Sequence, residues 1–289
     1  MKSHFWLLIL LLATALSSLA SSIETPFFKL TTPDDSWQLS NDGGALGSIG
    51  TRVLLSRSDG KHEAIDLARI DYLDLAFSPR AYLQQEVVGR RDIFVHDNIT
   101  LMGQVADTTF KGLPAQRVHF DKQAHDTTYR CVALAFNAGY GTFFIIQARR
   151  QGTPPIVGRV VAGMEFKCDA TQLTTVAELV KAATATLKRR SIPLTGGGSE
   201  VLKAVHMPDT TTVEFTVMIP YLKQDAVEVP LFVQAKRDQW MKTRQSGAVP
   251  SLLLEAAMRE RKDLRYTYVD DHNAVIGSLL IMAEEYESL

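Results

Sequence analysis

Histidines beside acidic residues are the parts of this sequence that could carry out catalysis or hold a metal ion. His119 and His125 flank the sequence FDKQA, and His272 directly follows Asp270 and Asp271. Hydrolysis needs a nucleophile held next to a base, and zinc proteases need the H-E-x-x-H spacing. Neither pattern occurs around these histidines, so the sequence predicts structural roles for them.

Other polar clusters lead to the same prediction. His206 stands just before a proline at an expected strand end, and Asp71 and Asp74 do not match the D-x-[DN]-x-[DN]-G calcium loop. The sequence therefore predicts no catalytic residue and no cofactor, and it allows metal binding only as a weak surface event. The alternative is an envelope hydrolase whose active-site residues come together only in the fold.

The glycine-rich stretch NDGGALGSIG, residues 41–50, raises the question of phosphate binding. A phosphate loop opens a helix, because the free amides of the helix N-terminus bind the anion. Here the following RVLLSRS is typical of a strand, and Gly44, Gly47 and Gly50 do not fit G-x-G-x-x-G. We expect a flexible connection between two strands, with a ligand-contacting loop as the alternative.

The first 20 residues have the pattern of a secretory signal peptide. Lys2 precedes the apolar run FWLLILLLATAL, and Ser18 and Ala20 are the small residues expected before a cleavage site. This run of about 12 residues is shorter than the roughly 20 that span a bilayer. The sequence predicts a periplasmic or secreted protein with no stable membrane span after signal cleavage.

Composition limits the class of protein further. The chain has 289 residues, of which 46% are hydrophobic and 22% charged, which suits two soluble globular domains. Its formal net charge of -1 and the lack of a long basic run make nucleic acid an unexpected partner. Cys131 and Cys168 are the only cysteines, and in an exported chain such a pair is predicted to form a disulfide.

Strand-like segments separated by short turns dominate the first half of the chain. Ser78 and Pro79 mark the start of a short helix, and Pro155 lies near the start of another. Between them, YRCVALAF places alternate residues on two faces, both of them largely apolar. This pattern predicts a strand that is covered on both sides.

The first half also resembles a known fold. The segments KGLPAQRVHF, YRCVALAF and GTFFIIQA, with a small turn at Gly112, Pro114 and Ala115, resemble the PsbP-like α/β fold over residues 25–168. This resemblance implies a secreted or periplasmic domain that binds, assembles or chaperones another protein and is not an enzyme.

The second half begins with the clearest helical pattern, in DATQLTTVAELVKAATATLKRR. Two strands follow, separated at Pro208 and Asp209, then two helices in VPLFVQAKRDQWMKTRQ and PSLLLEAAMRERK, and a final hairpin. This order is similar to that of small exported bacterial proteins of unknown function ending in a Tyr-x-Tyr-x-Asp hairpin. Some of those proteins have cysteines beside the hairpin, and this chain has none there.

These observations predict an α+β protein with two domains, each an antiparallel sheet with packed helices. The predicted parts are a signal peptide (1–20), a PsbP-like domain (21–168) and a C-terminal domain (169–289). The predicted function is non-catalytic protein binding, as an immunity-type inhibitor or a secretion-system accessory factor. Aromatic residues dominate binding hot spots, and the aromatic residues expected to contact the partner are Tyr140, Trp240, Tyr266 and Tyr268.

Overall fold

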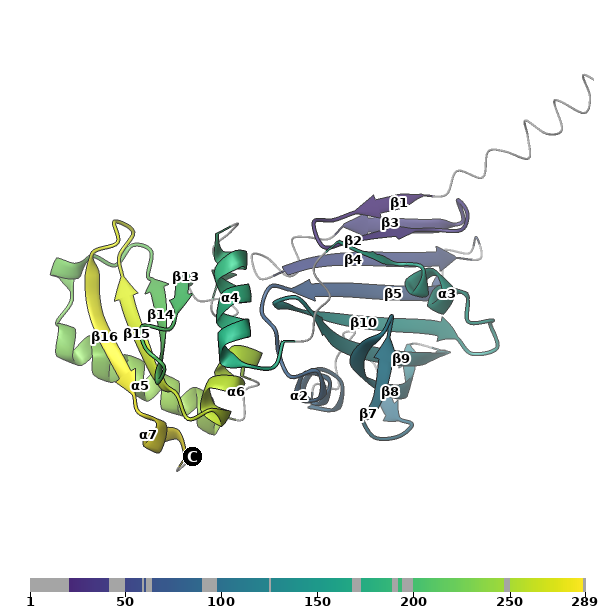
Figure 1. Ribbon diagram of the computed structural model, residues 1–289. Coiled ribbons are helices and arrows are strands. Elements are labelled where there is room, and N and C mark those ends of the chain that lie inside the picture. Colours follow the sequence, from purple (N-terminus) through teal and green to yellow (C-terminus); the bar gives the residue numbers. More distant parts are fainter. Residues whose placement is uncertain are drawn as a thin grey trace, which may run out of the picture.

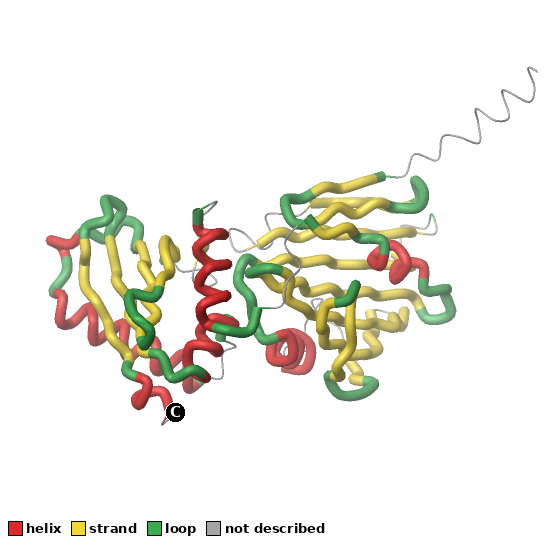
Figure 2. Tube along the Cα trace, viewed as in Figure 1, coloured by secondary structure: helices red, strands yellow, loops and turns green. Residues whose placement is uncertain are grey.

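The computed structural model describes residues 21–41, 50–58, 60, 64–89, 98–124, 126–167, 173–188, 192–193, 200–246 and 250–287. The predicted signal peptide, residues 42–49 of the glycine-rich stretch, His125 and Cys168 lie outside the described residues. No helix among the described residues is long and apolar enough to cross a bilayer. The architecture is α+β, with helices packed against sheets (Figures 1 and 2).

The first half is built on an eight-stranded antiparallel sheet with the order β3-β4-β5-β10-β9-β8-β6, in which β7 also pairs with β8 (Figure 1). Its strands are β3 (Trp37–Asn41), β4 (Gly50–Ser58), β5 (Ala64–Leu73), β6 (Asn98–Leu101), β7 (Ala106–Phe110), β8 (Leu113–Ala124), β9 (Thr127–Ala138) and β10 (Gly141–Arg150). A smaller sheet contains β1 (Ser22–Glu24), β2 (Phe28–Thr31) and β11 (Glu165–Phe166). The helical segments of this half are α2 (Pro79–Leu83), the π-helical turn η2 (Gln84–Gly89) and α3 (Ile156–Ala162).

Strand β9 is buried on both faces, which confirms the prediction from its sequence. Cys131, Ala133 and Ala135 pack in one cluster with residues of α2 and η2. Leu134 and Phe136 pack in a second cluster with α3 and the three-stranded sheet. Because successive side chains of a strand point to opposite faces, these two clusters lie on opposite sides of the sheet.

The same alternation argues against the predicted disulfide between Cys131 and Cys168. Cys131 is a free thiol that is almost completely buried, and it lies on the side of the sheet covered by α2. Phe166, two residues before Cys168, packs on the other side with α3. The sheet therefore separates Cys131 from the segment that leads to Cys168.

The second half is a five-stranded sheet, β12-β13-β14-β15-β16, with four helices and a short 3-10 turn (Figure 1). Its strands are β12 (Ile192–Pro193), β13 (Val201–His206), β14 (Thr212–Met218), β15 (Asp263–Val269) and β16 (Val275–Ile281). Its helical segments are α4 (Val176–Leu187), η3 (Gln224–Ala226), α5 (Val229–Gln245), α6 (Leu252–Arg259) and α7 (Ala283–Glu287). The predicted order of helix, two strands, two helices and hairpin is confirmed.

One strand pair departs from the antiparallel arrangement that the sequence predicted. β14 and β15 are parallel, whereas β13 pairs with β14 and β15 with β16 in the antiparallel sense. Parallel neighbours need a crossover connection, and α5 and α6 provide it between the end of β14 and the start of β15. The carboxyl ends of both strands therefore lie at the same end of the sheet.

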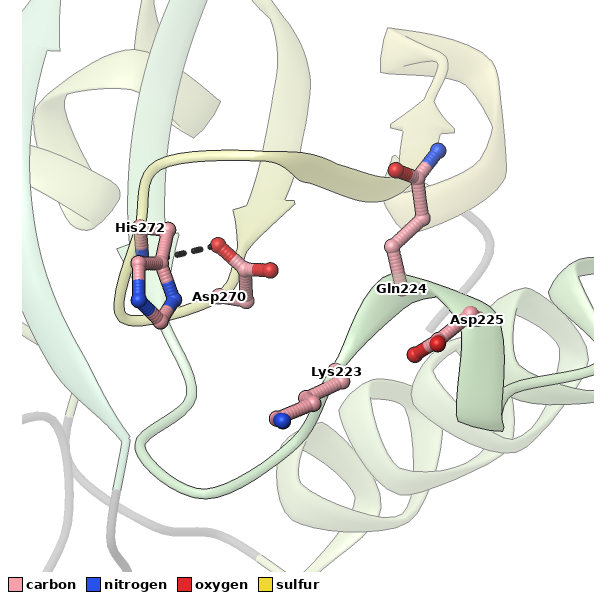
Figure 3. A pocket seen from close by; sticks show the side chains of 5 residues that line it. All are labelled: Lys223, Gln224, Asp225, Asp270 and His272. Carbon is pink, nitrogen blue, oxygen red and sulfur yellow. Dashed lines mark hydrogen bonds between the residues drawn. The ribbon is translucent and has the colours of Figure 1, made fainter.

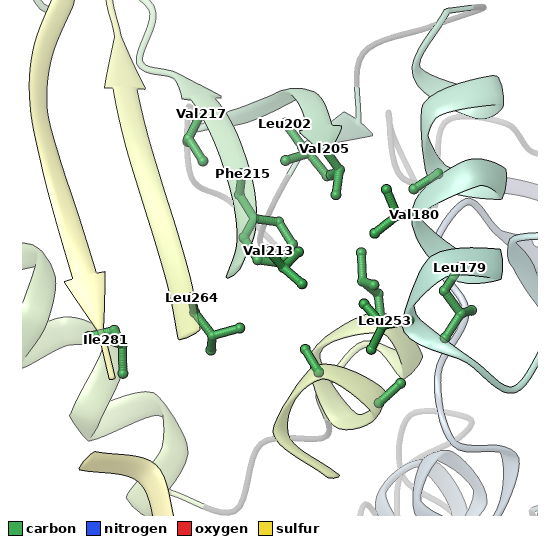
Figure 4. Close-up of a cluster of buried hydrophobic side chains, with 14 of the residues drawn as sticks. Leu179, Val180, Leu202, Val205, Val213, Phe215, Val217, Leu253, Leu264 and Ile281 are labelled. Atoms are coloured by element: carbon green, nitrogen blue, oxygen red, sulfur yellow. The ribbon is translucent and has the colours of Figure 1, made fainter. Parts of the chain in front are cut away.

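The core of the second half lies between its sheet and its helices. Val205, Val213 and Leu264 from the strands meet Val180 of α4 and Leu253 of α6 (Figure 4). The residues that alternate with them on β14 and β15 are polar and only partly buried, namely Glu214, Thr216, Arg265 and Thr267. This sheet has an apolar face against helices and a polar face that is partly open to water, a common arrangement for sheets with antiparallel strands.

The two halves meet at the end of the β9–β10 hairpin. Thr142 Oγ1 lies 2.8 Å from Asn137 Oδ1 and accepts a hydrogen bond from Phe77 N at 2.8 Å. Asn137 Nδ2 donates to the carbonyl oxygen of Phe77 at 3.0 Å, so the segment after β5 is held on the hairpin. Phe77 forms a bridge with Ser251, the N-cap of α6, and Tyr140 is buried in the core cluster of the second half.

Candidate functional site

Polar side chains gather where the parallel strands β14 and β15 end. Met218 and Val269, the last residues of the two strands, are paired, and Ile219 N donates to Val269 O at 2.9 Å. The segments that follow the two strands therefore lie next to each other, at the end of the sheet where both strands finish. In sheets with helices, ligands commonly bind outside the carboxyl ends of parallel strands.

The turn after β15 is organised by Asp270, whose side chain is buried. One carboxylate oxygen accepts hydrogen bonds from the main-chain nitrogens of His272, at 2.9 Å, and Ala274, at 2.8 Å. The turn also places Asn273 at a φ of 65°, in the left-handed region that asparagine tolerates better than most residues. Asp270 thus has a structural task, because it holds the turn between β15 and β16.

A shallow cavity of about 380 Å³ separates this turn from the segment after β14. Asp270 and His272 line one side, and Lys223, Gln224 and Asp225 line the other (Figure 3). The cavity opens to solvent, and the His272 and Asp271 side chains beside it are 76% and 49% exposed. The site is therefore a polar depression on the surface and not a closed pocket.

The chemistry available in this depression is limited. Ligand atoms of Asp270, Asp271 and His272 lie within 4.8 Å of one another, which is the spacing of a possible cation site. His272 Nδ1 lies 2.7 Å from Asp271 Oδ1, but none of the five lining residues has a hydroxyl or thiol nucleophile. A covalent hydrolytic mechanism needs a nucleophile next to its base, so the lining residues do not form such a centre.

Exposed apolar side chains are concentrated in the second half, and some of them lie beside this depression. Among the described residues, six of the ten large apolar side chains that are exposed belong to it, namely Tyr221, Val229, Leu231, Val275, Leu280 and Met282. They lie after β14, at the start of α5, and on β16 and the residue after it. We call these six residues the apolar rim. Exposed apolar groups that gather beside polar ones are typical of protein-interaction surfaces.

Strand β16 adds main-chain groups to the same region. It forms an edge of its sheet, and its sequence VIGSLLI contains no charge and no proline. The opposite edge, β12, is only two residues long and ends in Pro193. Short strands and prolines protect sheet edges from pairing with other chains, so β16 is the less protected edge. Arg237 Nη2 of α5 donates a hydrogen bond to Leu280 O of this strand at 2.8 Å.

The aromatic residues that the sequence assigned to a partner lie elsewhere. Tyr140 and Tyr268 are 4% and 6% exposed and belong to the core of the second half. Trp240 and Tyr266 pack against the same core, and Trp240 Nε1 donates to the Tyr266 hydroxyl at 3.2 Å. Burial raises the pKa of Tyr266 to about 12. The prediction is corrected, because α5 covers the face of β15 that carries Tyr266 and Tyr268, and Phe232 of α5 stacks edge-on against Tyr268.

The other candidate histidines and aspartates that the structure describes lie on separate strands. His119 is on β8, where partial burial and the charge of Arg117 lower its pKa. His206 is on β13, with Nε2 3.7 Å from Glu214 Oε2. Asp71 is buried at the end of β5 and accepts two hydrogen bonds from Arg52, at 2.8 and 3.1 Å.

Sequence reasoning singled out the Asp270–His272 turn but missed Lys223, Gln224 and Asp225. These residues are separated from the turn by about 45 positions and come close only because β14 and β15 are parallel. The order strand, two helices, strand was visible in the sequence, and it is the pattern that a crossover requires. That order was the signal that could have placed the two segments together.

No family model and no curated protein matches the chain. Among solved structures, it is similar to cyanobacterial PsbP (CyanoP) from Synechocystis sp. PCC 6803, with a TM-score of 0.38, 8% identity, and coverage of 52% of this chain and 93% of that chain. It is also similar to a crystal structure from Bacteroides thetaiotaomicron VPI-5482, with a TM-score of 0.36, 13% identity, and coverage of 59% and 61%. The first match is consistent with the PsbP-like resemblance of the sequence. At such TM-scores, neither likeness supports a conclusion about activity or ligands.

Proposed function

We propose that this chain is an exported, non-catalytic protein-binding module that acts in the periplasm or outside the cell. Its roles would be those of an immunity-type inhibitor or an accessory factor of a secretion system. The observation that supports this proposal is the apolar rim of the second half, whose residues Tyr221, Val229 and Val275 are close in sequence to those that line the polar depression. An apolar patch with polar neighbours excludes water on contact and lets polar groups select the partner.

The rim suggests how the partner is held. Leu231 is 64% exposed on the outer side of α5, and Val275 is 51% exposed at the start of the unprotected edge strand β16. An extended segment of the partner would pair with main-chain groups of β16 and cover these side chains, as in strand addition to a sheet edge. The acidic residues Asp225 and Asp271 would favour a partner with basic groups at this position.

The binding test uses capture of envelope proteins by the purified mature chain, followed by mass spectrometry and by affinity measurement with the recovered partner. Leu231→Asp and Val275→Asp should each weaken binding by about 2 kcal/mol or more, because each places a charge in a desolvated contact. Leu101→Asp is the matched control, since Leu101 is 42% exposed on β6 in the other half. A partner that is lost with Leu101→Asp and kept with the rim variants would contradict the assigned surface.

The alternative, an envelope hydrolase, has a separate test. His272→Ala should leave partner binding and folding close to those of the unchanged chain, because exposed histidines are seldom hot spots. Loss of a hydrolytic activity in this variant, with folding and binding preserved, would replace the binding module with the enzyme.

Export is tested independently of binding. The signal-peptide pattern predicts cleavage after Ala20. N-terminal sequencing of protein recovered from the envelope or the medium should begin at Ser21. Protein that retains Met1 in the cytoplasm would show that the export part of the proposal is wrong.

A further inference from the structure

A second cavity lies on the first sheet, far along the chain from the apolar rim. Its volume is about 310 Å³, and it extends over strands β3, β4, β5 and β10. Cross-strand pairing puts Leu54, Arg69 and Ile146 in one row and Ser56, Leu67 and Ala148 in the next. All six side chains are therefore on the same face of the sheet, the face that carries Cys131.

The floor of this cavity is apolar. Ile146 and Ala148 are 1% and 2% exposed, whereas Leu54 at the rim is 38% exposed. Helix α2 covers the part of this face formed by β8 and β9, through Leu83. The cavity lies beside this covered part, so a ligand there would extend an existing apolar cluster.

Arg69 gives the cavity a cationic end. Its side chain is 17% exposed, and its guanidinium carbon lies 5.3 Å from the centre of the Phe144 ring. Nε is 3.1 Å from Asp71 Oδ2, but this nitrogen is buried and its N–H makes no hydrogen bond. A buried N–H without a hydrogen bond is costly.

The neighbouring acidic groups neutralise the positive charge of Arg69 only in part. Asp71 accepts both of its hydrogen bonds from Arg52, so a single carboxylate is shared by two guanidinium groups. Glu86 of η2 adds a smaller attraction. Burial lowers the pKa of Arg69, which still remains charged at neutral pH because arginine ordinarily titrates far above it.

We propose that this cavity binds a monocarboxylate with an unbranched apolar chain, whose carboxylate meets Arg69 between Leu54 and Ile146 and whose chain extends over the next row, at Leu67 and Ala148. Arginine pairs with carboxylates through two parallel hydrogen bonds, which would supply acceptors for the idle donors. A volume of about 310 Å³ holds roughly ten heavy atoms at about 30 Å³ each, which is the size of octanoate. This site is independent of the partner surface proposed above.

The test is isothermal titration calorimetry of the mature chain with octanoate, acetate and octylamine at matched pH and salt. Octanoate should bind at least about ten-fold more tightly than either of the others, because acetate lacks the apolar chain and octylamine has the wrong charge. Undetectable binding of octanoate at millimolar concentration, or equal binding of octylamine, would overturn the proposal.

Two variants locate the ligand. Arg69→Met removes the charge and keeps an apolar stem over Phe144, and Leu54→Asp puts a negative charge at the exposed rim of the cavity. Each should weaken octanoate binding by about ten-fold or more, and Leu101→Asp on β6 should leave it unchanged. Unchanged affinity in folded Arg69→Met would contradict the assignment. If circular dichroism shows that Arg69→Met does not fold, Leu54→Asp replaces it as the test. Unchanged octanoate affinity in folded Leu54→Asp would then contradict the assignment.

Discussion

The two large sheets of this chain bury their strands to different extents. The central strands of the first sheet, such as β10, are covered on both faces, and Phe143 and Phe144 on neighbouring positions are both completely buried. On β14 of the second sheet, buried Val213, Phe215 and Val217 alternate with partly exposed residues. The central strands of the first sheet are buried in the core on both faces, whereas the second sheet keeps one polar face and one strand edge exposed.

The largest expected effect tests the core of the first sheet. Phe143 packs against Phe28, Tyr72, Phe136 and Phe166 with ring centroids 4.8 to 5.7 Å apart. Phe143→Ala should lower the free energy of unfolding by about 3–5 kcal/mol, because it removes a buried ring and leaves a cavity. Urea unfolding measures this loss.

A matched substitution in the second half sharpens the comparison. Phe232→Ala should cost less than Phe143→Ala, because Phe232 is only partly buried on α5, a helix without any fully buried residue. An equal cost for the two substitutions would show that the second half is packed as tightly as the first.

The turn beside the polar depression gives an intermediate effect. Asp270→Ala removes the acceptor for two main-chain N–H groups and should cost about 1–3 kcal/mol. Asp271→Ala, at an exposed neighbouring position, should change stability by no more than about 0.5 kcal/mol. Urea unfolding of both variants measures the difference, and equal costs would mean that Asp270 does not hold the turn.

At neutral pH the smallest effect concerns the thiol of Cys131, whose ionisation changes stability only at high pH. Burial raises its pKa from 9.0 to about 12, so the folded state keeps its proton at a pH where the unfolded state loses it. The stabilisation is complete below about pH 9 and is lost as the pH rises toward about 12, by roughly 1.4 kcal/mol per unit. Compared with Cys131→Ala, the unchanged chain should therefore lose stability more steeply over this range.

Thiol titration checks the same residue directly. In Cys168→Ala, Ellman's reagent should react with Cys131 only after denaturation, and without any reductant. A fast reaction in the folded protein would show that the thiol is accessible and that the buried position is wrong.

Sequence patterns predicted individual helices and strands well, because short-range periodicity largely determines these elements. The alternation in YRCVALAF correctly predicted a strand buried on both faces, and the helical pattern in DATQLTTVAELVKAATATLKRR correctly predicted α4. The alternation also contained the argument against a bond from Cys131 to Cys168. That argument also requires knowing which face of the sheet α3 covers, and tertiary packing determines this face.

The candidate site was harder to predict because it depends on the path of the chain between strands. The order strand, two helices, strand was only an indirect sign that β15 lies parallel to β14, and only this pairing brings Lys223 near Asp270. Tyr266 and Tyr268 were predicted to contact a partner because the sequence does not show that α5 packs over this face of β15. The surroundings of Arg69 were not predictable for a similar reason, since its neighbour Ile146 comes from β10, which is distant in sequence.

The junction between the halves bears on how the molecule melts. A fragment that ended after α3 would leave the Tyr140 ring and Leu75 exposed to water, because both pack into the core of the second half. It would also lose Ser251, which pairs with Phe77. Unfolding of either half would therefore remove packing contacts that stabilise the other. A scanning calorimeter should record one endotherm for the whole chain, and the N-terminal fragment alone should melt at a lower temperature.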